Sequence, residues 1–307
     1  MTQRGFSLKG LKMVVRAIAV VTSSIAAIIS TALPLLLGYD VTVLGLFGLS
    51  LLLVTGALLV HGVLAHVLND LMDFESGTDQ ASPALLSGGS RVIQDGVMSL
   101  GSLRRMAVLA TIILLSAGLL FMVLGQFKLV ILTLIGIWGA VTYSTRPFIF
   151  AYRPFLGEWV SLFPSMLLLG FAAPWIMLDS VPLWAWQNAT INALWCMAWV
   201  MVHHIPDLNA DRNAVPKKRT SVVWSVERYG LYRAGLPALI YLILVFIIVT
   251  TMISGRPIGA VGALLMLGYA IYLILSMDVK DIEQVTQREK VLLLLAMSTA
   301  VWLGIFY

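Results

Sequence analysis

Two acidic clusters carry the residues best suited to chemistry. The first occupies residues 66–79, HVLNDLMDFESGTD, and follows a long apolar run. Its Asp70 and Asp73 are three residues apart, so they share one face if the helix continues through them. The second occupies residues 204–212, HIPDLNADR, and also follows an apolar run. Carboxylate oxygens at the ends of two helices are suitable ligands for magnesium that carries a phosphate group.

The two clusters are more than solvated helix ends. Acidic side chains at a helix C-terminus oppose the helix dipole and call for a compensating cation. A lone pair favours the solvated interpretation, but here two pairs recur at matching positions, each before a basic loop. We therefore expect two Mg²⁺ ions, one held by Asn69, Asp70 and Asp73 and the other by Asp207 and Asp211.

The rest of the chain has the composition of a membrane protein. Of its 307 residues, 60% are apolar and only 11% are charged, whereas a soluble domain carries about 25% charged residues. We expect an all-α, polytopic membrane protein that forms a single domain over residues 1–307, with related halves at about 14–146 and 156–277 and a final helix at 288–307. Nine transmembrane helices are expected at about 14–38, 42–68, 105–125, 128–146, 156–178, 184–205, 233–254, 257–277 and 288–307.

The charges are distributed to one side of these helices. The N-terminus and the longer loops hold nearly all the basic residues, and the opposite side keeps only Lys128 and Arg256. Nearly all the acidic residues share that basic side, which leaves Asp40 and Asp179 opposite. The positive-inside rule places the polar face in the cytoplasm, so we expect a plasma-membrane protein with a cytoplasmic active site. A transporter would need ionisable residues near mid-membrane, which makes transport the weaker alternative.

The motifs resemble those of the UbiA-type membrane prenyltransferases over nearly the whole chain. Asn69-Asp70-x-x-Asp73 with Gly77-Thr78-Asp79 is similar to the first aspartate motif of that family. Asp207-x-x-x-Asp211 followed by Lys218-Arg219-Thr220 is similar to the second. Within the family, the branch that prenylates 1,4-dihydroxy-2-naphthoate for menaquinone is resembled most closely, through Ser87-Gly88-Gly89-Ser90-Arg91-Val92-Ile93-Gln94, Tyr143-Ser144, Tyr152-Arg153 and Gly157-Glu158.

This resemblance implies a helical bundle with a central cavity that opens to the cytoplasm. It also implies a magnesium-dependent transfer of a polyprenyl group from an allylic diphosphate to an aromatic acceptor, with the lipid bilayer as surroundings and no nucleic acid as a partner. The departing diphosphate needs cations around it. The candidates are Arg91, Arg146, Arg153, Lys218 and Arg219. Basic residues beside a membrane also contact anionic lipid head groups, which is the alternative for Lys218 and Arg219.

The carbocation left by the diphosphate needs a pocket that excludes water. We expect Tyr143, His66 and Trp199 to line the acceptor and prenyl pocket, where aromatic rings can stabilise a cation. The acceptor must also lose a proton, and Asp79, Glu75 and Asp207 remain equal candidates to accept it. Two enzyme alternatives also stay open at this point: another acceptor for the same metal site, and a terpene cyclase that uses the prenyl diphosphate alone.

Overall fold

The computed structural model describes residues 7–83 and 86–307, and in this part of the chain all regular structure is helical. Seven helices in these residues are long and apolar enough to cross a bilayer. These segments identify an integral membrane protein. They are Ala17–Gly38, Val43–Ser76, Leu100–Val123, Phe127–Ser144, Gly157–Met177, Leu231–Thr250 and Pro257–Leu275.

The helices follow one another with short connections, and several long ones are composites. The first half of the chain contains α1 (Leu8–Val15), α2 (Ala17–Val20), the π-helix η1 (Val21–Ile25), α3 (Ala26–Gly38), α4 (Val43–Ala57), the π-helix η2 (Leu58–Ala65), α5 (His66–Ser76), α6 (Thr78–Ala81), α7 (Leu100–Val123) and α8 (Phe127–Ser144). The second half contains the 3₁₀ helix η3 (Phe150–Tyr152), the π-helix η4 (Gly157–Leu162), α9 (Phe163–Met177), α10 (Leu183–His203), α11 (Leu208–Asn213), α12 (Ser221–Tyr229), the 3₁₀ helix η5 (Leu231–Arg233), α13 (Leu236–Thr250), α14 (Pro257–Leu275) and α15 (Ile282–Ile305).

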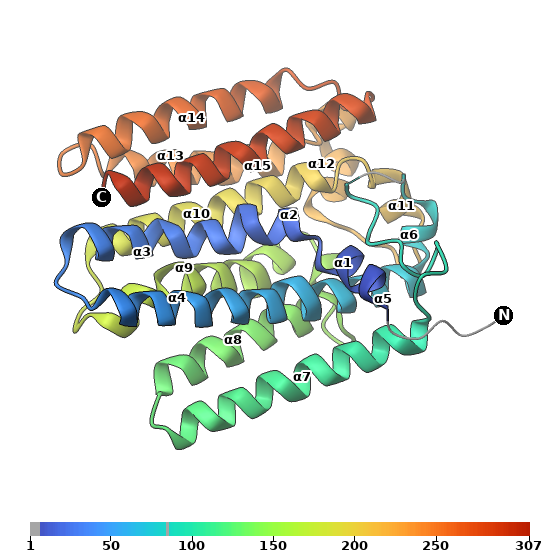
Figure 1. The fold of residues 1–307 in the computed structure, drawn as a ribbon. Helices are drawn as coiled ribbons and strands as arrows, with labels where there is room; N and C mark the ends of the chain where they lie inside the picture. The colour runs from blue at the N-terminus through green and yellow to red at the C-terminus, as the bar shows by residue number, and fades with distance from the viewer. Residues whose placement is uncertain (1–6, 84–85) are drawn as a thin grey trace.

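Helix α10 lies at the centre of the bundle. It packs against α9, α13, α15 and α3, and most of its residues are buried. The largest apolar core joins α10 to α13, α14 and α15 (Figure 1). The sequence predicts spans at 184–205 and 288–307, and both fall on long helices, α10 and α15, that are not among the seven membrane-length apolar helices. Their interior polar residues, such as Asn188 and Glu289, lower their hydropathy.

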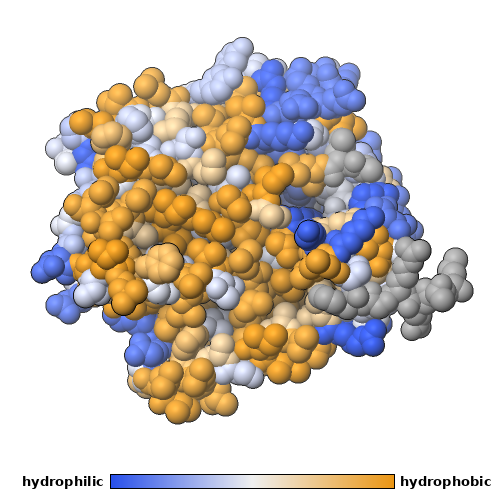
Figure 2. Space-filling model, in the orientation of Figure 1, coloured by the Kyte–Doolittle hydropathy of each residue, from blue (hydrophilic) through white to orange (hydrophobic). Residues whose placement is uncertain are grey.

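The polar elements gather at one end of this bundle. The short helices α6, α11 and α12 lie together there, next to the end of α5 (Figure 1). Figure 2 shows a broad apolar surface over the long helices, with large hydrophilic patches at the end that carries these short helices. The fold therefore separates an apolar belt, which suits lipid, from a polar end that can hold charged side chains.

The helix that carries the first acidic cluster is longer than the sequence predicts. The apolar run suggested an end near residue 68, but the continuous helix of α4, η2 and α5 runs from Val43 to Ser76. It stops at Gly77, whose φ of 85° is the left-handed conformation that ends many helices. Asp70 and Asp73 therefore lie on the last turns of a membrane-length helix, on a shared buried face.

Candidate active site

Five aspartates from three short stretches of chain converge at the polar end. Asp70 and Asp73 come from α5, Asp79 from α6, and Asp207 and Asp211 from the start of α11. All five are at most 5% exposed. The two acidic clusters are far apart in the sequence and were expected on the same side of the membrane; here they lie together, and a backbone hydrogen bond of 2.9 Å from Val215 N to Ser76 O ties their loops to each other.

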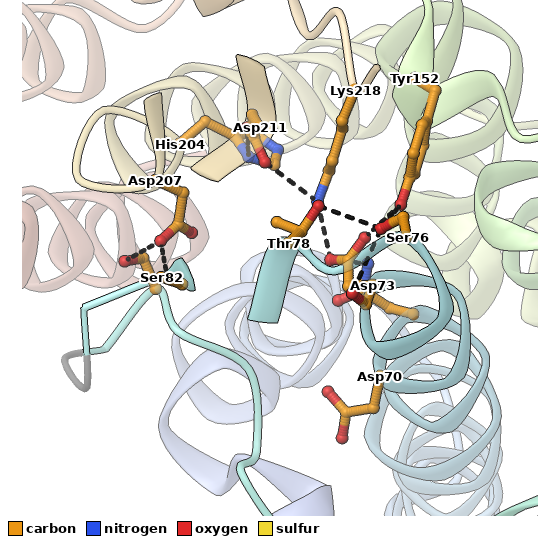
Figure 3. Close-up of polar contacts among 12 residues, drawn as sticks. Asp70, Asp73, Ser76, Thr78, Ser82, Tyr152, His204, Asp207, Asp211 and Lys218 are labelled. Carbon is orange, nitrogen blue, oxygen red and sulfur yellow. Dashed lines mark hydrogen bonds and ion pairs between the residues drawn. The ribbon is translucent and has the colours of Figure 1, made fainter. Parts of the chain in front are cut away.

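Lys218 lies between the two clusters and pairs with one aspartate of each (Figure 3). Its Nζ is 2.7 Å from Asp73 Oδ2 and 3.7 Å from Asp211 Oδ1, and the residue is only 3% exposed. Burial lowers the pKa of Lys218, but the carboxylates of Asp73 and Asp211 more than offset this and raise it well above its usual value. The ammonium group is therefore a permanent positive charge within the acidic cluster.

The other partners of Asp73 fix its carboxylate further. Tyr152 donates its hydroxyl to Asp73 Oδ1 at 2.8 Å, and the Asn69 amide donates to Oδ2 at 3.0 Å. The Tyr152 hydroxyl also lies 2.7 Å from Ser76 Oγ, and Lys218 Nζ is 5.6 Å from the centre of the Tyr152 ring. Tyr152 thus supports Asp73 and covers Lys218, whereas its neighbour Arg153 points to the surface over Phe150.

Asp70 has separate partners, and one of them was not expected as a site residue. Arg16, between α1 and α2, makes an ion pair with Asp70 and lines the cavity described below. Its φ of 44° bends the chain there, which brings α1 over the end of α5. The backbone N–H of Ser90 donates to Asp70 at 3.2 Å, and the Ser90 hydroxyl donates to the same carboxylate. The sequence signal for Arg16 was its position as a basic residue near the start of the first predicted span, after Lys9 and Lys12.

The loop that follows α6 lies across this cluster. Ser82 and Ser87 both donate hydroxyl hydrogen bonds to Asp207 Oδ1, the second at 3.1 Å. Gly89 adopts a φ of +68° and lies so close to Asp79 that an added Cβ would be 2.5 Å from Asp79 Oδ2. Ser82 and Ser87 therefore contact a carboxylate of the second cluster and Gly89 lies against one of the first, so these loop residues cover the polar end.

Burial raises the pKa of two carboxylates at this polar end, those of Asp79 and Asp211. It raises the pKa of Asp79 to about 8, with the neighbouring Asp73 and Asp70 carboxylates acting in the same direction. Burial also raises the pKa of Asp211 well above its usual value, although the Lys218 ammonium opposes that change. Several negative charges confined in one buried space favour protonation or a bound cation.

A cavity of about 730 Å³ extends from the charged cluster into the apolar part of the bundle. This volume is within the range of about 300–1,000 Å³ that is usual for small-molecule sites. At the polar end its walls include Arg16, Asn69, Asp73, Asp207 and Lys218. Deeper in the bundle its walls are apolar or small residues of α4, η2, α7 and α8, among them Leu52, Gly56, Ala117, Phe121, Leu132 and Gly136.

The predicted pocket residues all line the cavity, whereas only one of the five predicted cations does. Tyr143, His66 and Trp199 all line the cavity. Among the five predicted cations, Lys218 also lines it, whereas Arg146 and Arg153 are exposed outside its lining. The remaining two pair with nearby acids on the surface: Arg91 Nε is 3.8 Å from Asp95 Oδ1, and Arg219 Nε is 2.8 Å from Glu227 Oε2.

The carboxylates offer oxygen atoms, which are the ligands that magnesium prefers. Both side-chain oxygens of Asp211 are fully buried without a hydrogen-bond partner, a condition that a bound cation would relieve. In residues 7–83 and 86–307, however, no three His, Cys, Asp or Glu side chains are placed to hold a metal ion. Lys218 supplies the positive charge between Asp73 and Asp211 in this arrangement, so the described residues offer magnesium ligands without forming a preorganised metal centre.

Together these features define a class of protein: an integral membrane enzyme with a charged end over an apolar cavity, suited to a substrate that has a polar head and an apolar tail. The model of the UbiA prenyltransferase family matches residues 28–297, and the chain belongs to this family. It is therefore a prenyltransferase, and enzymes of this family are generally metal-dependent. Comparisons with curated proteins and with solved structures gave no match.

Proposed function

We propose that this enzyme transfers a polyprenyl group from an allylic diphosphate to an aromatic acceptor with the help of Mg²⁺. The acceptor that the motif resemblance favours is 1,4-dihydroxy-2-naphthoate, which would place the reaction in menaquinone biosynthesis. The observation that carries the proposal is the direct continuity between the charged cluster and the apolar cavity. The charged end can bind the diphosphate of a substrate while the apolar part of the same cavity holds its long hydrocarbon tail.

The diphosphate is proposed to bind at the polar end. Lys218 and Arg16 are the cations in the cavity wall there, and both now pair with carboxylates. A diphosphate accompanied by magnesium could take over these partners, since the metal satisfies the carboxylates while the cations turn to phosphate oxygens. We propose Asn69, Asp70, Asp73, Asp207 and Asp211 as the magnesium ligands. Magnesium would stabilise the negative charge that develops on the departing diphosphate.

The prenyl tail is proposed to occupy the apolar part of the cavity. The lining residues of the helix Val43–Ser76 range from Leu52 to Asp73, a distance of about 30 Å at 1.5 Å per residue. On α8 the lining runs from Leu129 to Tyr143, or about 21 Å. A tail of several isoprene units fits along these walls. The apolar lining keeps water from the carbocation, and the rings of Tyr143 and Trp199 face the same cavity.

The proposal includes the number of membrane spans and the orientation of the protein in the bilayer. We propose that α10 and α15 cross the bilayer together with the seven apolar helices, which gives nine spans in one domain, and that the site opens to the cytoplasmic side of the plasma membrane. The excess of Lys and Arg in the loops at the polar end supports this orientation. The polar side chains Gln187, Asn188 and Asn192 of α10 and Glu289 and Thr299 of α15 are buried against neighbouring helices, and the exposed charged residues of α15 lie within its first nine residues, at the polar end.

The experiment compares carboxylate variants with a distant control. Asp70→Asn and Asp207→Asn keep the side-chain size and remove the charge, and each should lower turnover about 10²–10³-fold, as expected for the loss of one group that stabilises transition-state charge. Asp179→Asn, exposed at the opposite end of the bundle, should leave turnover unchanged. Tryptophan fluorescence in detergent would establish that each variant is folded. Retained activity in both Asp70→Asn and Asp207→Asn would overturn the proposed site.

A further inference from the structure

A second polar cluster, which belongs to neither aspartate motif, borders the same cavity. His203, in the last turn of α10, lines the cavity, and its side chain is 15% exposed. Its Nδ1 lies 2.7 Å from Oε1 of Glu289 on α15. Its ring centre is 5.3 Å from that of Trp199, another cavity residue. A histidine held between a carboxylate and an aromatic ring is a group with a fixed orientation.

Glu289 is a buried carboxylate with only one of its two oxygens hydrogen-bonded. It is completely buried in the part of α15 that packs against α10. Its Oε2 has no hydrogen-bond partner among the described residues, and its Oε1 contacts His203. A buried carboxylate is costly unless a positive charge offsets it. The hydrogen bond with His203 is the one polar contact that Glu289 makes among the described residues, so the carboxylate holds the His203 ring in place.

The pair also determines which nitrogen of His203 is available. When Nδ1 carries the proton and donates it to Glu289 Oε1, Nε2 keeps its lone pair. Glu289 is not part of the cavity lining, whereas His203 is. The edge of the ring away from Glu289 is therefore the one that a bound molecule can reach.

The other three histidines lack such a carboxylate. His61 Nδ1 is 2.8 Å from the Ser24 hydroxyl, and the His66 ring lies 5.0 Å from that of His61. His204 is 3.8 Å from Asp211, which is itself close to the Lys218 ammonium. Among the four, His203 is the histidine whose ring is hydrogen-bonded directly to a carboxylate.

We infer that His203 is the base that removes the proton from the acceptor, and that Glu289 is the positioning residue that orients it. This inference rests on the proposed function. In the step, the C–O bond between the prenyl group and the diphosphate breaks and its electron pair leaves with the diphosphate. The π electrons of the hydroxylated ring form the new C–C bond to the prenyl carbon. The C–H bond at the attacked ring carbon then breaks, its electron pair restores the aromatic ring, and its proton goes to His203 Nε2, from which the imidazolium later passes it to solvent.

Two products measured in the same assay distinguish a role of His203 as a base from a purely structural role. Purified protein in lipid, with Mg²⁺, geranylgeranyl diphosphate and 1,4-dihydroxy-2-naphthoate, is analysed for released diphosphate and for prenylated acceptor. In His203→Gln, diphosphate release should stay within about tenfold of the parent while prenylated acceptor falls about 10²-fold, the usual contribution of a general base. The difference should appear as prenyl alcohol, because water then captures the carbocation.

Rescue and matched variants complete the test. Added imidazole should restore part of the prenylated product in His203→Gly, which also covers the case in which His203→Gln is poorly folded. Glu289→Gln should lower kcat for the prenylated product about tenfold with little change in KM for the acceptor. Glu283→Gln, exposed on the same helix, is the control and should match the parent.

The outcomes are distinguishable. If the parent protein releases no diphosphate, the proposed function fails. If the parent is active and His203→Gln keeps its prenylated product within threefold, or if imidazole restores nothing to folded His203→Gly, the inference about His203 is wrong and the proposed function stands.

Discussion

Replacement of Lys218 tests how the acidic cluster is held together. Lys218→Met keeps a side chain of similar length and removes the only ammonium within 4 Å of Asp73 and Asp211 among the described residues. Lys218 is 3% exposed and Asp211 is completely buried. The variant therefore leaves two buried carboxylates without the cation that pairs with both of them, and the free energy of unfolding should fall.

The expected magnitude follows from burial. Breaking a buried ion pair by removal of one partner costs about 3–5 kcal/mol, because the other charge stays buried and unpaired. Lys217 provides a matched control in the adjacent position: its Nζ is 2.5 Å from Glu227 Oε1, but its side chain is 49% exposed. Lys217→Met should cost less than about 1 kcal/mol, the usual value of a surface ion pair.

A double-mutant cycle isolates the interaction. Lys218→Met, Asp73→Asn and the double variant would be unfolded with graded SDS in detergent micelles and followed by the fluorescence of the nine tryptophans. We expect the double variant to cost about 2–3 kcal/mol less than the sum of the two single variants. Additive effects within about 0.5 kcal/mol, or a Lys218→Met cost no larger than that of Lys217→Met, would refute the reasoning.

Three further predictions concern the loop, the acidity of the cluster and the cavity. Gly89→Ala forces a Cβ to within 2.5 Å of Asp79 Oδ2, so it should lower turnover about tenfold more than Gly96→Ala, where φ is also positive (+64°) and no atom lies within 4 Å. Because the pKa of Asp79 is raised to about 8, its stabilising contribution is present below about pH 4 and is lost as the pH rises to about 8. Asp79→Asn should therefore lose less stability over that range than the parent, which thermal unfolding at several pH values would measure; equal losses would contradict this prediction. Ala117→Trp fills the apolar cavity and should slow turnover of a twenty-carbon diphosphate about tenfold more than that of a ten-carbon one. Leu120→Trp, on the exposed face of α7, is its control, and equal effects on the two substrates would show that the tail does not lie there.

The sequence was sufficient for the positions of the long helices and for the side of the bundle that carries the acidic clusters. Apolar runs of membrane length predicted the positions of the long helices, because a bilayer imposes its thickness on them. The same reasoning placed the clusters at helix ends on one side. It did not give the end of the second span, since the helix continues through polar residues to Ser76 once α1, α7 and the loop after α6 cover them.

The partners within the site depend on tertiary contacts that no local pattern encodes. The sequence offers Lys217, Lys218 and Arg219 as three adjacent cations, and only the fold shows that Lys218 is buried while the other two pair with Glu227 on the surface. Arg16 is 54 residues away from Asp70 in the chain. Glu289 is 86 residues away from His203. Such contacts follow from helix packing, which brings distant residues together without a signal in their immediate neighbours.

Product analysis tests the central claim most directly. Purified protein in lipid, with Mg²⁺ and geranylgeranyl diphosphate, would be assayed with and without 1,4-dihydroxy-2-naphthoate. We predict a prenylated naphthoquinol that forms only when the acceptor is present. A hydrocarbon or terpene alcohol formed equally well without the acceptor would instead indicate a cyclase, and a failure to consume the diphosphate with any chain length or acceptor would contradict the assigned reaction.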